Sequence, residues 1–174
     1  MKRPVVKSLL CVLLAAVLLF GLSFTLKGVA TKQAQAEHIR MMQTLLPGST
    51  DFVVEPYTGE DANVRSVHKG ETGFVVETST YGYASEITLL VGVSNEGTVT
   101  GLVVKQMNET KGLGMQALTD WQFLRQYLKT TGDAQVDALS GATVTTKAIT
   151  RCVNSAVAVV TGADAESSAT TWGG

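Results

Sequence analysis

The residue types best suited to chemistry gather in one short stretch, which reads Asp137-Ala138-Leu139-Ser140-Gly141-Ala142-Thr143 and continues to Thr145 and Thr146. Apolar residues recur at helical spacing from Val144 to Val160, which predicts a helix that begins near Thr143. The first turn of a helix exposes unpaired backbone N–H groups and the positive end of the helix dipole, which together suit a phosphate. Gly141 would let the backbone approach such a ligand closely. The stretch therefore predicts an anion site at a hydroxyl-rich helix start.

A second interpretation of the same stretch needs no ligand. Ser and Thr are frequent N-cap residues, so Ser140 and the threonines could cap the helix and do nothing more. Spacing alone favours this ordinary interpretation, and only other features of the chain separate the two.

A second glycine-containing loop lies upstream and reads Asn108-Glu109-Thr110-Lys111-Gly112-Leu113-Gly114. Together with Ala117, its glycines match the letters of the dinucleotide-binding fingerprint G-x-G-x-x-G/A. That fingerprint requires a second parallel strand after the following helix, whereas Lys129 to Gly132 opens a loop. We therefore expect no dinucleotide-binding fold here.

The composition of the chain argues against several function classes. All 15 acidic residues and 11 of the 14 basic ones lie at or beyond Lys27, so this part is acidic and lacks the basic stripe of a nucleic-acid-binding protein. Of the two cysteines, Cys152 is expected to be a small buried apolar residue. No nucleophile–base pair and no metal-ligating set is visible, which argues against an enzyme with its own substrate.

The elements that must position these residues follow from hydrophobic periodicity. Runs rich in β-formers at 87–93 and 98–104 flank Asn95-Glu96-Gly97 and predict an antiparallel hairpin. Further strands are predicted at 52–55, 64–68 and 74–78, and helices are predicted to end at Pro47-Gly48 and Gly162. A short helix capped by Thr119 or Asp120 should present Trp121, Leu124, Tyr127 and Leu128 on one side, with Trp121 and Tyr127 in the core. The predicted fold class is α+β.

An apolar segment without charge runs from residue 8 to residue 26 and is long enough to cross a bilayer as a helix. Lys2, Arg3 and Lys7 precede it, which favours a cytoplasmic N-terminus. A cleaved signal peptide is the competing interpretation, because small residues at 34–36 resemble a cleavage site. We expect residues 1–32 to form a cytoplasmic stub and membrane anchor, 33–163 an extracytoplasmic domain in either case, and 164–174 a disordered tail.

The two loops together resemble a known family. Asp137-x-x-Ser140-Gly141-Ala142-Thr143 resembles the pattern read by the flavin transferase that esterifies FMN onto threonine. Glu109-Thr110-Lys111-Gly112-Leu113-Gly114 resembles the E-T-P-G-L-G signature of the same FMN-binding domain, with Lys111 in place of Pro. With the anchor and hairpin in the same order, the chain resembles the FMN-binding family that includes the G subunit of the Rnf ion-translocating electron transport complex. It resembles more distantly the C subunit of the sodium-pumping NADH:quinone reductase.

The resemblance implies a role for each motif residue. Thr143 would carry covalent FMN through a phosphoester, and Asp137 would serve in recognition by the transferase. The phosphate and ribityl oxygens would be bound by the backbone of Ser140, Gly141 and Ala142 and by the hydroxyls of Thr145 and Thr146. The wall against the flavin ring would consist of Glu109, Thr110, Gly112, Leu113 and Gly114. No metal is implied.

The function that the resemblance implies is that of an electron-transfer component, and not of an enzyme by itself. It would relay electrons within an ion-translocating ferredoxin:NAD oxidoreductase complex in the cell membrane, with the other membrane subunits as partners and the anchor and hairpin edges as contacts. One alternative is a stand-alone extracytoplasmic FMN carrier that feeds a reductase. Another is a cofactor-free, membrane-anchored binding module.

Overall fold

The computed structural model describes residue 13 and residues 33–107, 114–132 and 136–163. The chain divides into two compact units, Met1–Arg40 and Met41–Gly174. In the first unit residues 33–40 are helical, and in the second unit residues 41–45 are helical. Within the described ranges, no helix has the length and apolar character needed to span a bilayer. The predicted anchor at 8–26 lies outside those ranges except for residue 13, as does the tail at 164–174.

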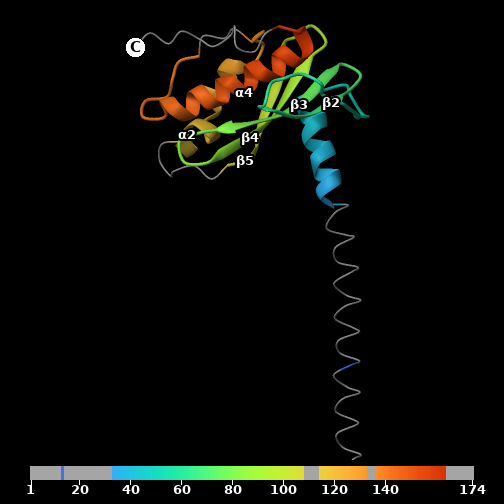
Figure 1. Cartoon of the computed structure of the whole chain (residues 1–174), viewed down its shortest axis with the longest axis horizontal. Coiled ribbons are helices and arrows are strands. Elements are labelled where there is room, and N and C mark those ends of the chain that lie inside the picture. The colour runs from blue at the N-terminus through green and yellow to red at the C-terminus, as the bar shows by residue number, and fades with distance from the viewer. Residues whose placement is uncertain (1–12, 14–32, 108–113, 133–135, 164–174) are drawn as a thin grey trace, which may run out of the picture. The chain divides into compact units, whose positions relative to one another are not determined.

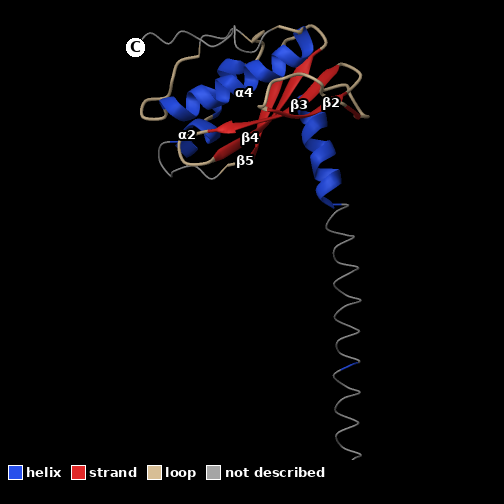
Figure 2. Ribbon diagram, viewed as in Figure 1, coloured by secondary structure: helices blue, strands red, loops and turns tan. Residues whose placement is uncertain are grey.

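The second unit is built on a five-stranded antiparallel sheet (Figure 2). Its strands are β1 (Val53–Glu55), β2 (Val64–Lys69), β3 (Gly73–Tyr81), β4 (Glu86–Ser94) and β5 (Val99–Gln106), and they pair in sequence order. The predicted hairpin is confirmed, since β4 pairs with β5 around a turn in which Gly97 has a φ of 80°. Every described strand pair is antiparallel, so the dinucleotide fold is absent from the described residues, as expected.

One face of the sheet is covered by the long helix α4 (Thr143–Thr161), which packs on β3 and β4 (Figure 1). A short helix, α2 (Gly114–Thr119), packs against α4 and contributes Ala117 and Leu118 to the same core. The apolar side chains of this core include Val76, Ile87, Leu89, Val91, Val93, Ile149, Cys152, Val153 and Ala156. α4 ends at Gly162, which adopts a left-handed conformation with a φ of 69°. The predicted start of this helix near Thr143 and its predicted end at Gly162 are therefore confirmed. The short helix α2 was not predicted.

The opposite face of the sheet is covered by the segment that follows residue 41. Met42, Leu45 and Leu46 pack there on Val75 and Leu90. The two sides of the sheet thus have separate apolar clusters, because successive side chains of a strand point to opposite faces.

The region between α2 and α4 differs from the prediction. Asp120 caps a helix as expected, and its Oδ1 accepts hydrogen bonds from the N–H groups of Gln122 (2.8 Å) and Phe123 (3.3 Å). That helix, α3 (Trp121–Leu124), gives way to a 3₁₀ turn, η1 (Arg125–Tyr127).

The predicted buried face of this region was wrong for one of its two aromatic residues. Trp121 is 64% exposed, while Phe123 and Tyr127 are buried and meet edge to face with ring centroids 5.7 Å apart. The two residues are four positions apart, so one side of the short helical segment faces the core and the opposite side carries Trp121.

Candidate functional site at the start of helix α4

A tight turn delivers the chain to the start of α4. The N–H of Ala142 donates to the carbonyl oxygen of Leu139 at 2.9 Å, and Gly141 has a φ of 80°. A positive φ at the third residue of such a turn strongly favours glycine. Gly141 is therefore required by the backbone, whatever else it contacts, and the turn leaves Ser140 and Gly141 on the surface.

The N-cap of α4 is not one of the hydroxyl residues that one interpretation of the sequence expected there. The N-cap residue is Ala142, and its side chain makes no capping hydrogen bond. The first helical residue is Thr143, whose side chain is exposed. The N-cap itself therefore leaves this helix start without a side-chain acceptor, an arrangement that suits an anionic ligand.

The other two threonines of the motif lie beneath the surface. Thr145 is 1% exposed and Thr146 is fully buried. The Oγ1 atom of Thr146 has no hydrogen-bond partner among the described residues, although a buried hydroxyl normally has one. Of the three threonines, Thr143 alone is exposed to an approaching molecule. Three positions further along the chain, Thr146 has a buried hydroxyl with no hydrogen-bond partner among the described residues.

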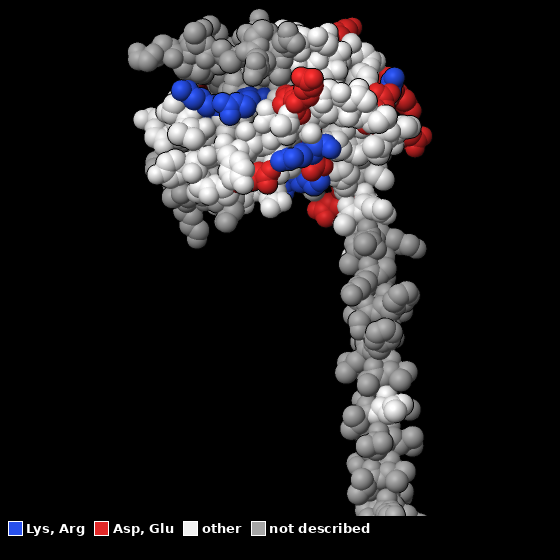
Figure 3. Space-filling model, viewed as in Figure 1, with Lys and Arg blue, Asp and Glu red and all other residues white. Residues whose placement is uncertain are grey.

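Two basic side chains follow Thr143 along α4. Lys147 and Arg151 are exposed at intervals of four residues, which places them on the same face of the helix as Thr143. Neither forms an ion pair with another described residue. Figure 3 shows basic side chains over the surface where α4 lies in Figure 1, and acidic side chains elsewhere on the same face. The field near Thr143 therefore favours an anion.

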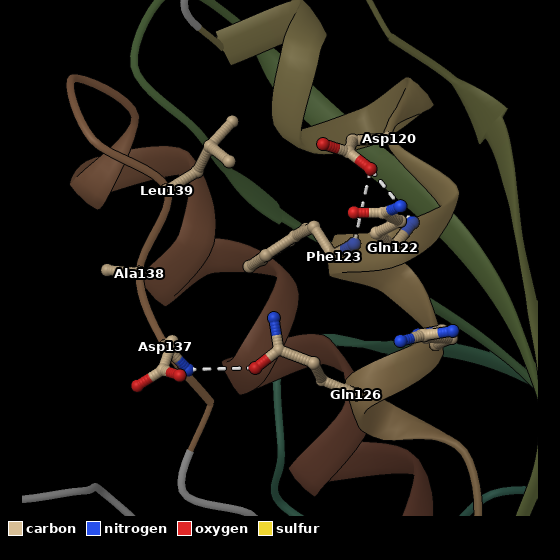
Figure 4. Close-up of a pocket in the computed structure, with 8 residues that line it drawn as sticks. Asp120, Gln122, Phe123, Gln126, Asp137, Ala138 and Leu139 are labelled. Carbon is tan, nitrogen blue, oxygen red and sulfur yellow. Dashed lines mark hydrogen bonds between the residues drawn. The ribbon is translucent and has the colours of Figure 1, made fainter.

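A groove lies beside the segment that leads to this turn (Figure 4). One wall consists of Asp137, Ala138 and Leu139, and the other of Asp120, Gln122, Phe123, Arg125 and Gln126. The walls are joined by a hydrogen bond in which the N–H of Asp137 donates to Oε1 of Gln126 at 3.0 Å. Figure 4 shows the carboxylate of Asp137 pointing away from Gln126. The structure thus leaves this carboxylate on the surface.

Tyr127, which follows Gln126 in the 3₁₀ turn η1, is hydrogen-bonded to α4. Its hydroxyl lies 2.8 Å from Oγ1 of Thr150, which in turn donates to the carbonyl oxygen of Thr146 at 3.0 Å. Because Thr150 uses its proton on Thr146, the Tyr127 hydroxyl is the donor to Thr150. Burial raises the pKa of Tyr127 well above its usual value, so this proton stays in place.

The remaining sequence-predicted residues divide into two groups. Glu109, Thr110, Lys111, Gly112 and Leu113 lie outside the described residues, so the ring wall proposed for them stays a prediction. Gly114 is described and is the buried first residue of α2.

The expectation for Cys152 is confirmed, because this residue is fully buried in the core of α4 and the sheet. Burial raises the pKa of its thiol to about 11, so it is protonated and unreactive near neutral pH.

Two residues near the site were missed at the level of sequence. Gln126 and Tyr127 connect η1 to both sides of the motif, yet Gln126 belongs to no motif and Tyr127 was expected only as a core residue. No local pattern identifies such contacts, because they join positions 11 and 23 residues apart.

The chain is similar to proteins of a known family. Residues 82–158 match the family described as FMN-binding domain. The chain is 33% identical to the G subunit of the ion-translocating oxidoreductase complex of Methanosarcina acetivorans over 174 positions, which cover 88% of this chain and 91% of that protein.

Two further relatives match over shorter regions. The G subunit of the Na(+)-translocating ferredoxin:NAD(+) oxidoreductase complex of Acetobacterium woodii is 38% identical over 50% of this chain and 48% of its own length. The G subunit of the proton-translocating ferredoxin:NAD(+) oxidoreductase complex of Clostridium ljungdahlii is 36% identical over 51% of this chain and 53% of its own length. The chain therefore spans about half of each of these two relatives.

These matches confirm the family resemblance that was inferred from the two loops. The chain belongs to the family formed by the G subunits of ion-translocating oxidoreductase complexes and contains their FMN-binding domain.

Proposed function

We propose that this protein is a membrane-anchored flavoprotein that carries FMN covalently on Thr143 and relays electrons within an ion-translocating ferredoxin:NAD oxidoreductase complex. The observation that carries the proposal is the position of Thr143, an exposed hydroxyl on the first residue of a helix whose N-cap offers no side-chain acceptor. It lies within the segment that matches an FMN-binding domain, and the relatives are named as subunits of such complexes.

The residues around Thr143 fit a phosphoester of FMN. The positive end of α4 and the exposed Lys147 would offset the charge that the phosphate retains after esterification. The backbone of Ser140 to Ala142, bent by Gly141, would approach the phosphate, whereas the unpaired hydroxyl of Thr146 lies buried behind it. When bound, FMN supplies reversible electron transfer at its ring, while the protein supplies position and electrostatics.

Attachment to Thr143 requires an activated donor, because an alcohol does not displace hydroxide from a phosphate monoester under mild conditions. A flavin dinucleotide is such a donor. The Oγ1 of Thr143 would attack the phosphorus of the flavin half, forming the O–P bond as the P–O–P anhydride bond breaks. The nucleoside monophosphate would leave, and the hydroxyl proton would pass to a base of the flavin transferase. No electrons are exchanged in this step.

Covalent attachment is tested on a denaturing gel with protein from its natural host. The band of the full-length chain should fluoresce under ultraviolet light, and the tryptic peptide that contains Thr143 should carry the mass of FMN less one water. Thr143→Ala should give a dark band. Thr145→Ala is the matched control and should stay fluorescent, because the side chain of Thr145 is buried and cannot be the acceptor.

Two results would overturn the attachment site. A fluorescent Thr143→Ala band would move the linkage elsewhere, and a dark wild-type band with an unmodified peptide would remove covalent FMN from the proposal altogether. Protein made without a flavin transferase should fold but remain colourless.

The place of the protein in a complex is a separate part of the proposal. After solubilisation in mild detergent, the full chain should co-purify with further membrane subunits, in line with the names of its relatives. Purification of the fluorescent protein alone, with full electron-transfer activity toward a soluble reductase, would favour a stand-alone carrier instead.

The membrane anchor at residues 8–26 is the third part of the proposal. Its support is the 19-residue uncharged run and the basic residues that precede it. The full chain should stay in the membrane pellet after washing at high pH, and the domain should be digested by protease added from the extracytoplasmic side. A freely soluble protein with a new N-terminus near residue 37 would show a cleaved signal peptide in its place.

A further inference from the structure

The 3₁₀ turn η1 contacts the motif segment on both sides of Thr143. On the upstream side, Oε1 of Gln126 accepts the hydrogen bond from the N–H of Asp137 at 3.0 Å. On the downstream side, the adjacent Tyr127 donates to Thr150, which donates to Thr146 in the first turns of α4. Two neighbouring residues therefore tie down the two flanks of the segment that carries Thr143.

The two contacts differ in what they can affect. Tyr127 is fully buried within the main core, so its loss would disturb folding as well as the site. Gln126 is only half-buried and lies at the rim of the groove. Asp137 and Ala138 are exposed, and the bond to Gln126 is the hydrogen bond that holds Asp137 to the other described residues. Gln126 can therefore be changed without a large loss of core packing.

We propose that Gln126 is a positioning residue for the loading of FMN onto Thr143: its hydrogen bond to the backbone of Asp137 holds the 137–142 segment in the arrangement that the flavin transferase binds. This inference rests on the proposed function. The bond uses the N–H of Asp137 and leaves the carboxylate free on the surface, as Figure 4 shows. Gln126 thus presents Asp137 to a partner without itself contacting the flavin.

The expected effect follows from the strength of one hydrogen bond. Losing a neutral bond of this kind lowers the equilibrium constant for the ordered arrangement of the segment by about fivefold, so the ordered fraction falls by at most that factor. When only a fraction of the molecules is competent to bind, the apparent affinity falls by that fraction. The KM of the transferase for this chain should therefore rise measurably, by up to about fivefold, while kcat stays unchanged. A loss of chain to irreversible misfolding would raise the apparent KM in the same way, but it would also lower the amount of flavin-labelled chain at completion, which the positioning role leaves at the wild-type level.

The experiment uses full-length chain in detergent, made without a flavin transferase, together with purified transferase and flavin dinucleotide. Initial rates of gel fluorescence are measured against the concentration of the chain. Gln126→Leu removes the acceptor, and Gln126→Asn keeps an amide but shortens its reach, so both should show the raised KM. Gln126→Glu retains an acceptor oxygen at the same distance and should stay within about twofold of wild type.

Gln122→Leu is the matched control, since Gln122 has the same side chain on the same wall of the groove but no bond across it. It should keep the wild-type KM. A wild-type KM for Gln126→Leu would overturn the inference, as would a Gln126→Glu variant that is as impaired as Gln126→Leu, or an equal rise in Gln122→Leu. If the wild-type chain accepts no flavin at all, the proposed function itself fails, which is a distinct result.

Discussion

A pair of glycines beneath Leu45 allows a sharp test of how the second unit is packed. Gly92 of β4 and Gly101 of β5 are register partners on the face that is covered by the segment after residue 41. A Cβ atom at position 92 would lie 2.5 Å from the carbonyl oxygen of Leu45 and 2.7 Å from Oγ1 of Thr100. A Cβ atom at position 101 would first meet the end of the Leu45 side chain, at 3.0 Å.

The two alanine substitutions should therefore differ in their effect on the free energy of unfolding. At position 92 the clash is with backbone, and forced overpacking costs about 1–3 kcal/mol. The shift would also break the bond from Thr100 Oγ1 to the Leu45 carbonyl, now 2.6 Å long, at about 1 kcal/mol. Replacing glycine returns about 0.4–1 kcal/mol of unfolded-chain entropy at either position. Gly92→Ala should thus cost about 1–3.6 kcal/mol, and Gly101→Ala about zero.

Urea unfolding of the full chain in detergent, followed by far-ultraviolet circular dichroism, measures both variants against wild type. The unfolding midpoint should fall for Gly92→Ala at an unchanged m-value and stay in place for Gly101→Ala. Equal midpoints for the two variants would refute the close approach of the Leu45 backbone to β4. A Gly101→Ala variant that is the less stable of the two would show that the segment lies over β5 instead.

Two further stability measurements test the core and the site region. Burial raises the pKa of Cys152 to about 11. As the pH rises, the thiol of the unfolded chain therefore loses its proton before the thiol of the folded chain does. The stability that the buried, protonated thiol contributes is complete below about pH 8.5 and is lost by about pH 11. Unfolding midpoints should therefore show wild type losing about 3 kcal/mol more than Cys152→Ala between pH 8 and 11, and parallel curves would contradict the burial of the thiol. Phe123→Ala should cost about 3 kcal/mol or more because Phe123 is 3% exposed, whereas Trp121→Ala should cost less than about 0.5 kcal/mol. If thermal unfolding showed a larger loss of stability for Trp121→Ala than for Phe123→Ala, the expectation that Trp121 lies in the core would be right.

Much of the framework was predictable from local pattern. The hairpin of β4 and β5 and the bounds of α4 follow from repeats of two and of 3.6 residues, which reflect burial of one face of each element. The family was predictable from two motifs in order. The orientation of residues 121–127 was not, because a four-residue helix followed by a 3₁₀ turn is too short for periodicity to define its buried side.

The sequence by itself determined which residues can do chemistry, since the hydroxyl at position 143, the glycine before it and the helix after it are local features. Only the tertiary structure decided which of those hydroxyls is presented to solvent. Thr143 is exposed while Thr145 and Thr146 are buried, because packing of α4 on the sheet selects one side of the helix. It also decided that η1 supports the motif, because the bonds of Gln126 and Tyr127 form only once segments far apart in the chain are folded together.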